Sequence, residues 1–182
     1  MSYVSWSVVY GEQPSAAKWN ILGSNDASFN DGTGIADGVI TSEALNATIA
    51  CRAYLSAAQN IQATTKVLLD TENYDLGSDF DTTNSRFVAP VTGYYQVNAS
   101  LLMNNVDAIS NQVITSIYVN GALYSFSKGY IPAANDDPSA TIADLVPATA
   151  GQYIELYGFC TTTNAVNNAS TSTYMSIHFI GV

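Results

Sequence analysis

The sequence predicts an all-β jelly-roll β-sandwich of about eight to ten strands, assembled as a trimer and preceded by a short extended stem. One observation is the composition, because charged residues make up only 11% of the chain, against about a quarter in typical globular proteins. The polar remainder is mainly Ser, Thr, Asn and Gly, which favours strands and turns. The other observation is that apolar residues recur at every second position from residue 50 onward, between clusters of turn residues. No segment has a convincing helical pattern.

The first 48 residues differ from the rest of the chain. Their large apolar residues are few and scattered, and residues 24–34 are nearly all of turn-forming types. Such a segment cannot bury a core by itself, so it needs partners, and identical copies of the segment are the simplest partners. We therefore expect residues 1–48 to form a stem that holds the trimer together and residues 49–182 to form the jelly-roll head.

The first half of the head contains four predicted strands. Alternation predicts Cys51–Leu55 and Ile61–Asp70, and Arg86–Ala89 is short because it stops at Pro90. The clearest strand is Tyr94–Met103, in which two types of side chain alternate. One face of this strand carries Tyr95, Val97, Ala99 and Leu101. This face is predicted to point into the core.

The second half begins with a predicted hairpin. Val113–Val119 and Ala122–Phe126 flank Asn120-Gly121, a pair that tolerates positive φ and favours a type I′ turn. Ser139–Leu145 and Tyr153–Cys160 follow, separated by a segment with Pro and Gly, and Tyr174–Val182 closes the chain. In this last strand one face is apolar, with Met175, Ile177 and Phe179.

Charge and hydropathy exclude several classes of partner. The net charge of -10 repels phosphate backbones and anionic membrane surfaces, so neither nucleic acid nor a membrane is expected as a partner. No run approaches the roughly 18 apolar residues of a membrane span. The first residues lack the pattern of a signal peptide, so we expect synthesis in a host cytoplasm without a secretion signal. Cys51 and Cys160 lack metal-ligand spacing and are predicted to be small buried side chains.

Two parts of the chain resemble known families. Residues 84–97, which include Phe87, Gly93 and the pair Tyr94-Tyr95, resemble the signature of the complement component-1q globular head, within the tumour-necrosis-factor-like superfamily. The closing residues 179–182 are similar to that family's last strand, and the likeness covers about residues 50–182. Residues 13–32 resemble segments of phage tail fibres. These resemblances imply a jelly-roll head on a phage fibre, a homotrimer, and a location in the virion.

The reversal of successive strands predicts which loops lie together. If both ends of the head lie at the stem, every tight turn falls on the stem side and the three longer loops fall at the free end. Amide, carboxylate and Tyr groups in those loops suit polyhydroxyl ligands. The predicted ligand-binding residues are Asn105, Asp107, Tyr130, Asn135, Asp136, Asp137, Asn164 and Asn167.

Outward positions on two strands predict the contact between subunits. If Met175, Ile177 and Phe179 face the core, the alternate side chains of the last strand face the threefold axis. The predicted interface residues are Tyr94, Asn98, Tyr174, His178 and Ile180. His178 is the chain's one histidine and has no partner set for a catalytic triad. No cofactor is expected, although Asp107, Asp136 and Asp137 leave calcium as an alternative, without EF-hand spacing.

Three functions can be compared with these features of the sequence. The leading one is a non-enzymatic receptor-binding tip, which attaches to glycan or protein on the host surface through several weak contacts at once and joins other fibre or virion proteins. The alternative is a structural cap that trimerises a fibre while another protein recognises the host. An enzyme such as a depolymerase is not expected, because scattered Asp and Glu residues do not establish the carboxyl pair that glycoside hydrolysis needs.

Overall fold

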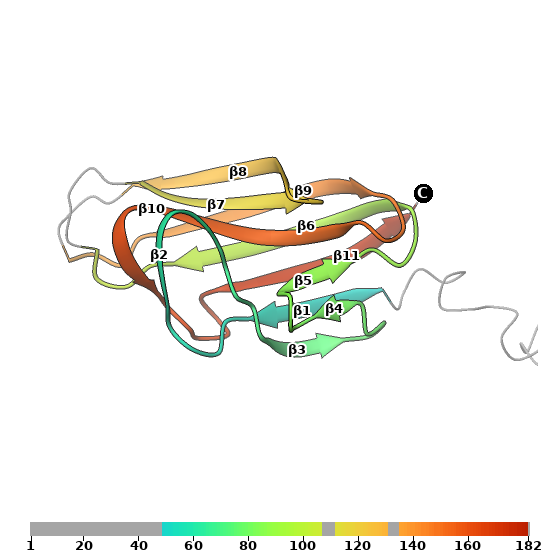
Figure 1. Cartoon of the computed structure of the whole chain (residues 1–182), viewed down its shortest axis with the longest axis horizontal. Helices are drawn as coiled ribbons and strands as arrows, with labels where there is room; N and C mark the ends of the chain where they lie inside the picture. The colour runs from blue at the N-terminus through green and yellow to red at the C-terminus, as the bar shows by residue number, and fades with distance from the viewer. Residues whose placement is uncertain (1–48, 107–111, 131–134, 182) are drawn as a thin grey trace, which may run out of the picture. The chain divides into compact units, whose positions relative to one another are not determined.

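The computed structural model describes residues 49–106, 112–130 and 135–181, and within these ranges the chain forms eleven strands and no helix. Two antiparallel sheets face each other in a sandwich (Figure 1). The first sheet has the order β3 (Thr71–Asp75), β1 (Ala50–Tyr54), β11 (Tyr174–Gly181), β6 (Gly93–Leu102) and β9 (Ser139–Ala148). The second has the order β4 (Phe80–Asp81), β5 (Arg86–Val88), β10 (Tyr153–Val166), β7 (Gln112–Val119) and β8 (Ala122–Tyr130), and β2 (Gln59–Lys66) also pairs with β10. The predicted all-β jelly-roll fold is confirmed.

The core lies between the inner faces of the two sheets. The predicted inward side chains of β6 and β11 are buried, including those of Tyr95, Leu101 and Ile177. The hydroxyl of Tyr95 donates a 2.5 Å hydrogen bond to the carbonyl of Val91, so this phenol is buried with its polar atom paired. Cys51 and Cys160 are both free and buried, as expected of small core side chains.

The predicted hairpin turn joins β7 to β8. Asn120 and Gly121 have φ angles of 53° and 78°, as a type I′ turn requires. The N–H of Asn120 donates to the carbonyl of Tyr153 at 2.8 Å, which ties the turn to the start of β10. The two strands then run side by side from Val119↔Ala122 to Gln112↔Tyr130.

The strand predicted at Ile61–Asp70 was placed too far along the chain. This strand is β2, which ends at Lys66, and Val67 and Leu69 are buried without belonging to a strand. The N–H of Val67 donates instead to the carbonyl of Leu156 at 2.9 Å. The edge strand β3 was not expected, because its mostly exposed residues carry no apolar alternation.

Three strands extend further than predicted, which moves two candidate ligand-binding residues out of loops. Tyr130 is the last residue of β8, and Asn164 lies within β10. The distal part of β10 stays extended because β2 pairs with it, with Asn164 opposite Ile61. β9 continues through Pro147, which is tolerated because β9 is an edge strand of its sheet.

Several predictions concern residues outside the described ranges. The stem expected at residues 1–48 and the candidate ligand Asp107 are among them. The boundary between stem and head therefore stays a prediction. In the part of the chain that is described, no helix has the length and apolar character to cross a membrane.

Candidate functional site

The two ends of the sandwich differ in what they carry. We call one end the base, where the described residues start at Ile49 and β11 finishes at Gly181. The carbonyl of Ile49 accepts a 3.0 Å hydrogen bond from the N–H of Phe179, so these two segments lie side by side (Figure 1). The turn before β6 also lies there, because Tyr94 at the start of β6 pairs with Gly181 at the end of β11. The predicted grouping of tight turns with the start of the head is therefore observed in the described residues.

The opposite end, the tip, is formed by segments from three distant parts of the chain. Backbone bridges join Met103 to Val166 and Val106 to Asp136. The N–H of Asn104 donates to the carbonyl of Ala165 at 2.8 Å, and the N–H of Asn135 donates to the carbonyl of Val106 at 3.0 Å. The described parts of the three predicted loops thus meet at the end of the sandwich remote from Ile49.

Polar side chains bind the tip segments to one another. Oδ1 of Asp137 accepts the N–H of Asn105 at 2.6 Å, and Nδ2 of Asn167 donates to Oδ1 of Asn104 at 2.9 Å. Oδ1 of Asp136 accepts the N–H of Asp137 at 2.9 Å. These bonds fix the orientation of two carboxylates and two amides at the surface, which is the preorganisation that a binding site needs.

The predicted ligand-binding residues fall into two groups. Asn105, Asn135, Asp136, Asp137 and Asn167 belong to the connected tip. Asn164 instead donates through Nδ2 to the hydroxyl of Thr162 at 2.8 Å, within β10 itself. Tyr130, at the end of β8, is 67% exposed. Sequence reasoning missed the inter-loop bond of Asn104, which only the pairing of tip segments reveals.

Two of the three carboxylates that left calcium as an alternative lie in the described part of the tip. Within residues 49–106, 112–130 and 135–181, no group of three or more His, Cys, Asp or Glu side chains has the arrangement of a metal site. Asp136 and Asp137 are described, whereas Asp107 lies outside these ranges.

The five predicted interface residues share the outward face of the first sheet. On this face His178 pairs with Gln96, and Tyr174 pairs with Ser100. The guanidinium of Arg52 lies 4.0 Å from the centre of the Tyr174 ring, so the half nearer the tip is polar. The half nearer the base carries large exposed apolar side chains beside the polar residues Gln96 and His178. Exposed side chains there are Tyr94, Leu145 and Ile180, which we call the apolar patch.

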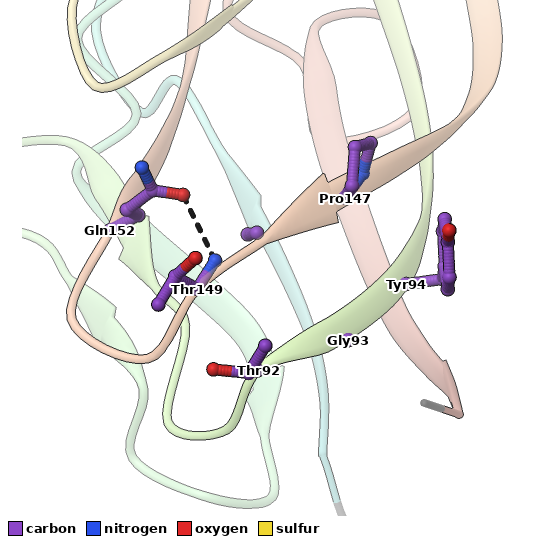
Figure 2. Close-up of a pocket in the computed structure, with 7 residues that line it drawn as sticks. Thr92, Gly93, Tyr94, Pro147, Thr149 and Gln152 are labelled. Atoms are coloured by element: carbon purple, nitrogen blue, oxygen red, sulfur yellow. Dashed lines mark hydrogen bonds between the residues drawn. The ribbon is translucent and has the colours of Figure 1, made fainter.

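A pocket at the base adjoins the apolar patch (Figure 2). It has a volume of about 410 Å³ and is lined by Thr92, Gly93, Tyr94, Pro147, Ala148, Thr149 and Gln152. The side-chain carbonyl of Gln152 accepts the N–H of Thr149 at 2.9 Å, which closes the turn beside the pocket. The pocket is remote from the tip, so it does not coincide with the predicted ligand loops.

Sequence comparison finds one curated relative and no family model. No family model matches the chain. The chain is 33% identical over 110 residues to the phage-like element PBSX protein XkdV of Bacillus subtilis (strain 168). The match covers 57% of this chain but 16% of that protein, so the chain spans a small part of its relative's length.

Solved structures share the fold at low sequence identity. The Eiger tumour necrosis factor of S. frugiperda has a TM-score of 0.60 at 10% identity, covering 74% of this chain and 94% of that one. Murine APRIL has a TM-score of 0.56 at 14% identity, covering 72% and 98%. The globular domain of zebrafish complement 1qA has a TM-score of 0.55 at 10% identity, covering 72% and 96%. At this identity the likeness establishes the jelly-roll fold and nothing about ligands.

Proposed function

We propose that this chain, whose head has the jelly-roll fold of tumour-necrosis-factor and complement-1q domains, is a non-enzymatic, trimeric fibre-tip protein of a phage particle that attaches to the host-cell surface. The observation that carries the proposal is the opposition of the two ends. The start of β1 and the end of β11 lie together at the base, while bonded polar loops form the tip. A head mounted by its base presents the tip outward.

The tip chemistry supports a polyhydroxyl or polar protein ligand. The carboxylates of Asp136 and Asp137 accept hydrogen bonds, and the amides of Asn105, Asn135 and Asn167 both donate and accept. The phenol of Tyr130 adds an aromatic face. Asp107 stays a proposed member of this group. We assign recognition and not hydrolysis, because a glycosidase needs two carboxyl groups on opposite sides of the scissile bond.

The apolar patch supports assembly of identical copies. Tyr94 is 48% exposed, Ile180 is 53% exposed, and Leu145 lies beside them at the sheet edge. The hydroxyl of Tyr124 on β8 donates to the carbonyl of Leu145 at 3.1 Å, so exposed apolar surface continues onto the flank formed by β8 and β9. A face on one copy and a flank on the next form a heterologous contact, which closes into a ring when the rotation is 120°.

In a trimer, three tips that each bind with low affinity are together sufficient for attachment. Each tip then meets the cell surface at a high effective concentration once its neighbour has bound, so contacts of low affinity give firm attachment. Tyr94, Asn98, Tyr174, His178 and Ile180 are proposed to face the partner copy. Lysis of the host cell would release such a protein as part of the particle, which agrees with a virion location.

The structural-cap alternative has one observation in its favour. The side chains of Asn104, Asn105, Asp137 and Asn167 bond within the tip, and such bonds also stabilise a tip that binds nothing. In that case the base and the apolar patch trimerise a fibre, and another protein recognises the host.

One variant separates the two functions. The double substitution Asp136→Ala with Asp137→Ala removes both tip carboxylates, and Glu72→Ala removes an exposed carboxylate on β3 as the control. Attachment predicts that the double variant loses adsorption to whole bacterial cells and signals on a glycan array, while Glu72→Ala keeps both. Unchanged adsorption favours the cap. A monomeric mass in light scattering overturns the trimer for both.

A further inference from the structure

The outward face of the second sheet carries a row of aromatic side chains that the proposed attachment does not use. Along β10 the inward residues Ile154 and Leu156 are fully buried. The outward positions between and beyond them are Tyr153, Glu155, Tyr157 and Phe159. Tyr118 of β7 pairs directly with Glu155, so its ring stands on the same face.

The tyrosines form a fixed surface and not a set of independent side chains. The rings of Tyr118 and Tyr157 are 4.1 Å apart between centres and inclined by 32°. The guanidinium of Arg86 lies 4.9 Å from the centre of the Tyr153 ring. All three tyrosines are partly exposed, and their neighbours hold the orientation of the rings.

Paired charges surround these rings. Glu155 has a side chain only 7% exposed, and its Oε1 contacts Nζ of Lys66, which also donates to the carbonyl of Asn84. Nε of Arg86 lies 3.3 Å from Oδ2 of Asp81. Two positive and two negative groups therefore cancel locally, on a chain whose net charge is -10. A charged ligand would have to break one of these pairs, whereas a neutral ligand would not.

We propose that Tyr118, Tyr153 and Tyr157 form a binding platform for a neutral oligosaccharide, with Lys66, Arg86 and Glu155 at its edge. The apolar C–H face of a pyranose ring packs on an aromatic face, and the hydroxyls at its rim find donors and acceptors in the flanking side chains. The hydroxyl of Tyr157 is a donor at neutral pH, as in any tyrosine, and partial burial, followed by the charge of Glu155, raises its pKa further. The platform is on a different sheet from the apolar patch and apart from the tip, so it is an additional sugar site.

Binding of defined sugars tests the platform. The full-length chain is titrated by calorimetry with cellohexaose, maltohexaose and chitohexaose, and with dextran sulfate as a charged polymer. At least one neutral hexasaccharide is expected to bind, and dextran sulfate is expected not to. Tyr118→Ala with Tyr157→Ala is expected to lower the affinity about tenfold, the loss that corresponds to one stacking contact. Tyr118→Phe with Tyr157→Phe keeps the rings and is expected to keep most of the affinity.

Matched variants decide between this surface and others. Tyr74→Ala removes an exposed tyrosine of β3 on the other sheet and is expected to leave the affinity unchanged. The proposal is overturned if no neutral hexasaccharide binds, or if the alanine pair binds as well as the unaltered chain. If the alanine pair fails to fold in a thermal melt, Tyr118→Ala alone is used with the same criterion. Loss of binding in Asp136→Ala with Asp137→Ala, but not in the alanine pair, assigns the sugar to the tip and also overturns the platform.

Discussion

The backbone N–H of Asn105 donates a 2.6 Å hydrogen bond to Oδ1 of Asp137, a residue 32 positions later in the chain. Asn105 has a φ of 50° and Asn135 a φ of 61°, a conformation that asparagine tolerates better than most residues. The bond thus joins two segments that each contain an asparagine with a positive φ. Asp137 therefore holds these two tip segments together, whether or not its side chain contacts a ligand.

Removing this acceptor is expected to loosen the tip without unfolding the head. In Asp137→Ala the N–H of Asn105 loses its partner, at a cost of about 1 kcal/mol confined to the loops. Amide hydrogen exchange at Asn105 and Val106 should speed up, while the global unfolding transition stays nearly unchanged. Asp137→Asn keeps a carbonyl acceptor and should restore most of the protection. Equal exchange in Asp137→Ala and the unaltered chain would show that the bond does not hold the loops.

Charge placed in the apolar patch is expected to separate the subunits. Tyr94→Glu with Ile180→Glu places two carboxylates where the proposed trimer excludes water, and burying unpaired charges costs several kcal/mol. Light scattering after gel filtration should report a monomer. Leu68→Glu, at a side chain 51% exposed outside the patch, is the control and should remain trimeric. A trimer in both variants would place the interface elsewhere.

Gly129 is expected to be intolerant of a side chain. A Cβ at this position would lie 2.4 Å from the backbone carbonyl oxygen of Ser139, where β8 and β9 approach each other. Since backbone cannot rotate away, Gly129→Ala should lower the free energy of unfolding by about 1–3 kcal/mol. Urea unfolding measures this, with Lys128→Ala as the neighbouring control. A loss no larger than in the control would mean that the two edge strands separate freely.

Asp70 is expected to make the head less stable in acid. Burial acts to raise the pKa of its carboxyl, but 2.8 Å hydrogen bonds from the N–H and the hydroxyl of Ser56 outweigh it and hold this pKa below its ordinary value of 3.8. A lowered pKa gives stability that is present above pH 3.8 and is lost as the pH falls through the folded-state value.

The test compares urea unfolding at pH 7 and pH 3. The drop in unfolding free energy between the two should be smaller in Asp70→Asn than in the unaltered chain. Glu72→Gln removes an exposed carboxylate outside this contact and serves as the control. If Asp70→Asn keeps the whole drop, the acid sensitivity arises from other groups.

The sequence predicted those elements that have one buried face. Tyr95 to Leu101 and Met175 to Phe179 alternate because each strand presents every second side chain to the core. The edge strand β3 was missed because it has no fully buried face. The distal half of β10 was missed because polar residues 161–163 interrupt the alternation, while long-range pairing with β2 keeps the strand extended.

The candidate sites were predictable to a lesser extent. Strand reversal alone placed the loops at one end, since each strand must begin where the previous one stopped. It did not indicate that Asn104 meets Asn167, because this contact depends on a bridge between Met103 and Val166. The outward tyrosines of β10 are visible at alternate positions in the sequence. The sequence does not show that these tyrosines lie near Lys66 and Arg86, because this proximity depends on the pairing of β10 with β2 and β5.

The hydrogen bond between the N–H of Phe179 and the carbonyl of Ile49 places the first and the last described segments of the sandwich side by side. When two ends of a folded unit are adjacent, a short linker can join them without straining the fold. A circular permutant in which Gly181 is linked to Ile49 and new ends are opened at the Asn120-Gly121 turn is therefore expected to keep the sandwich.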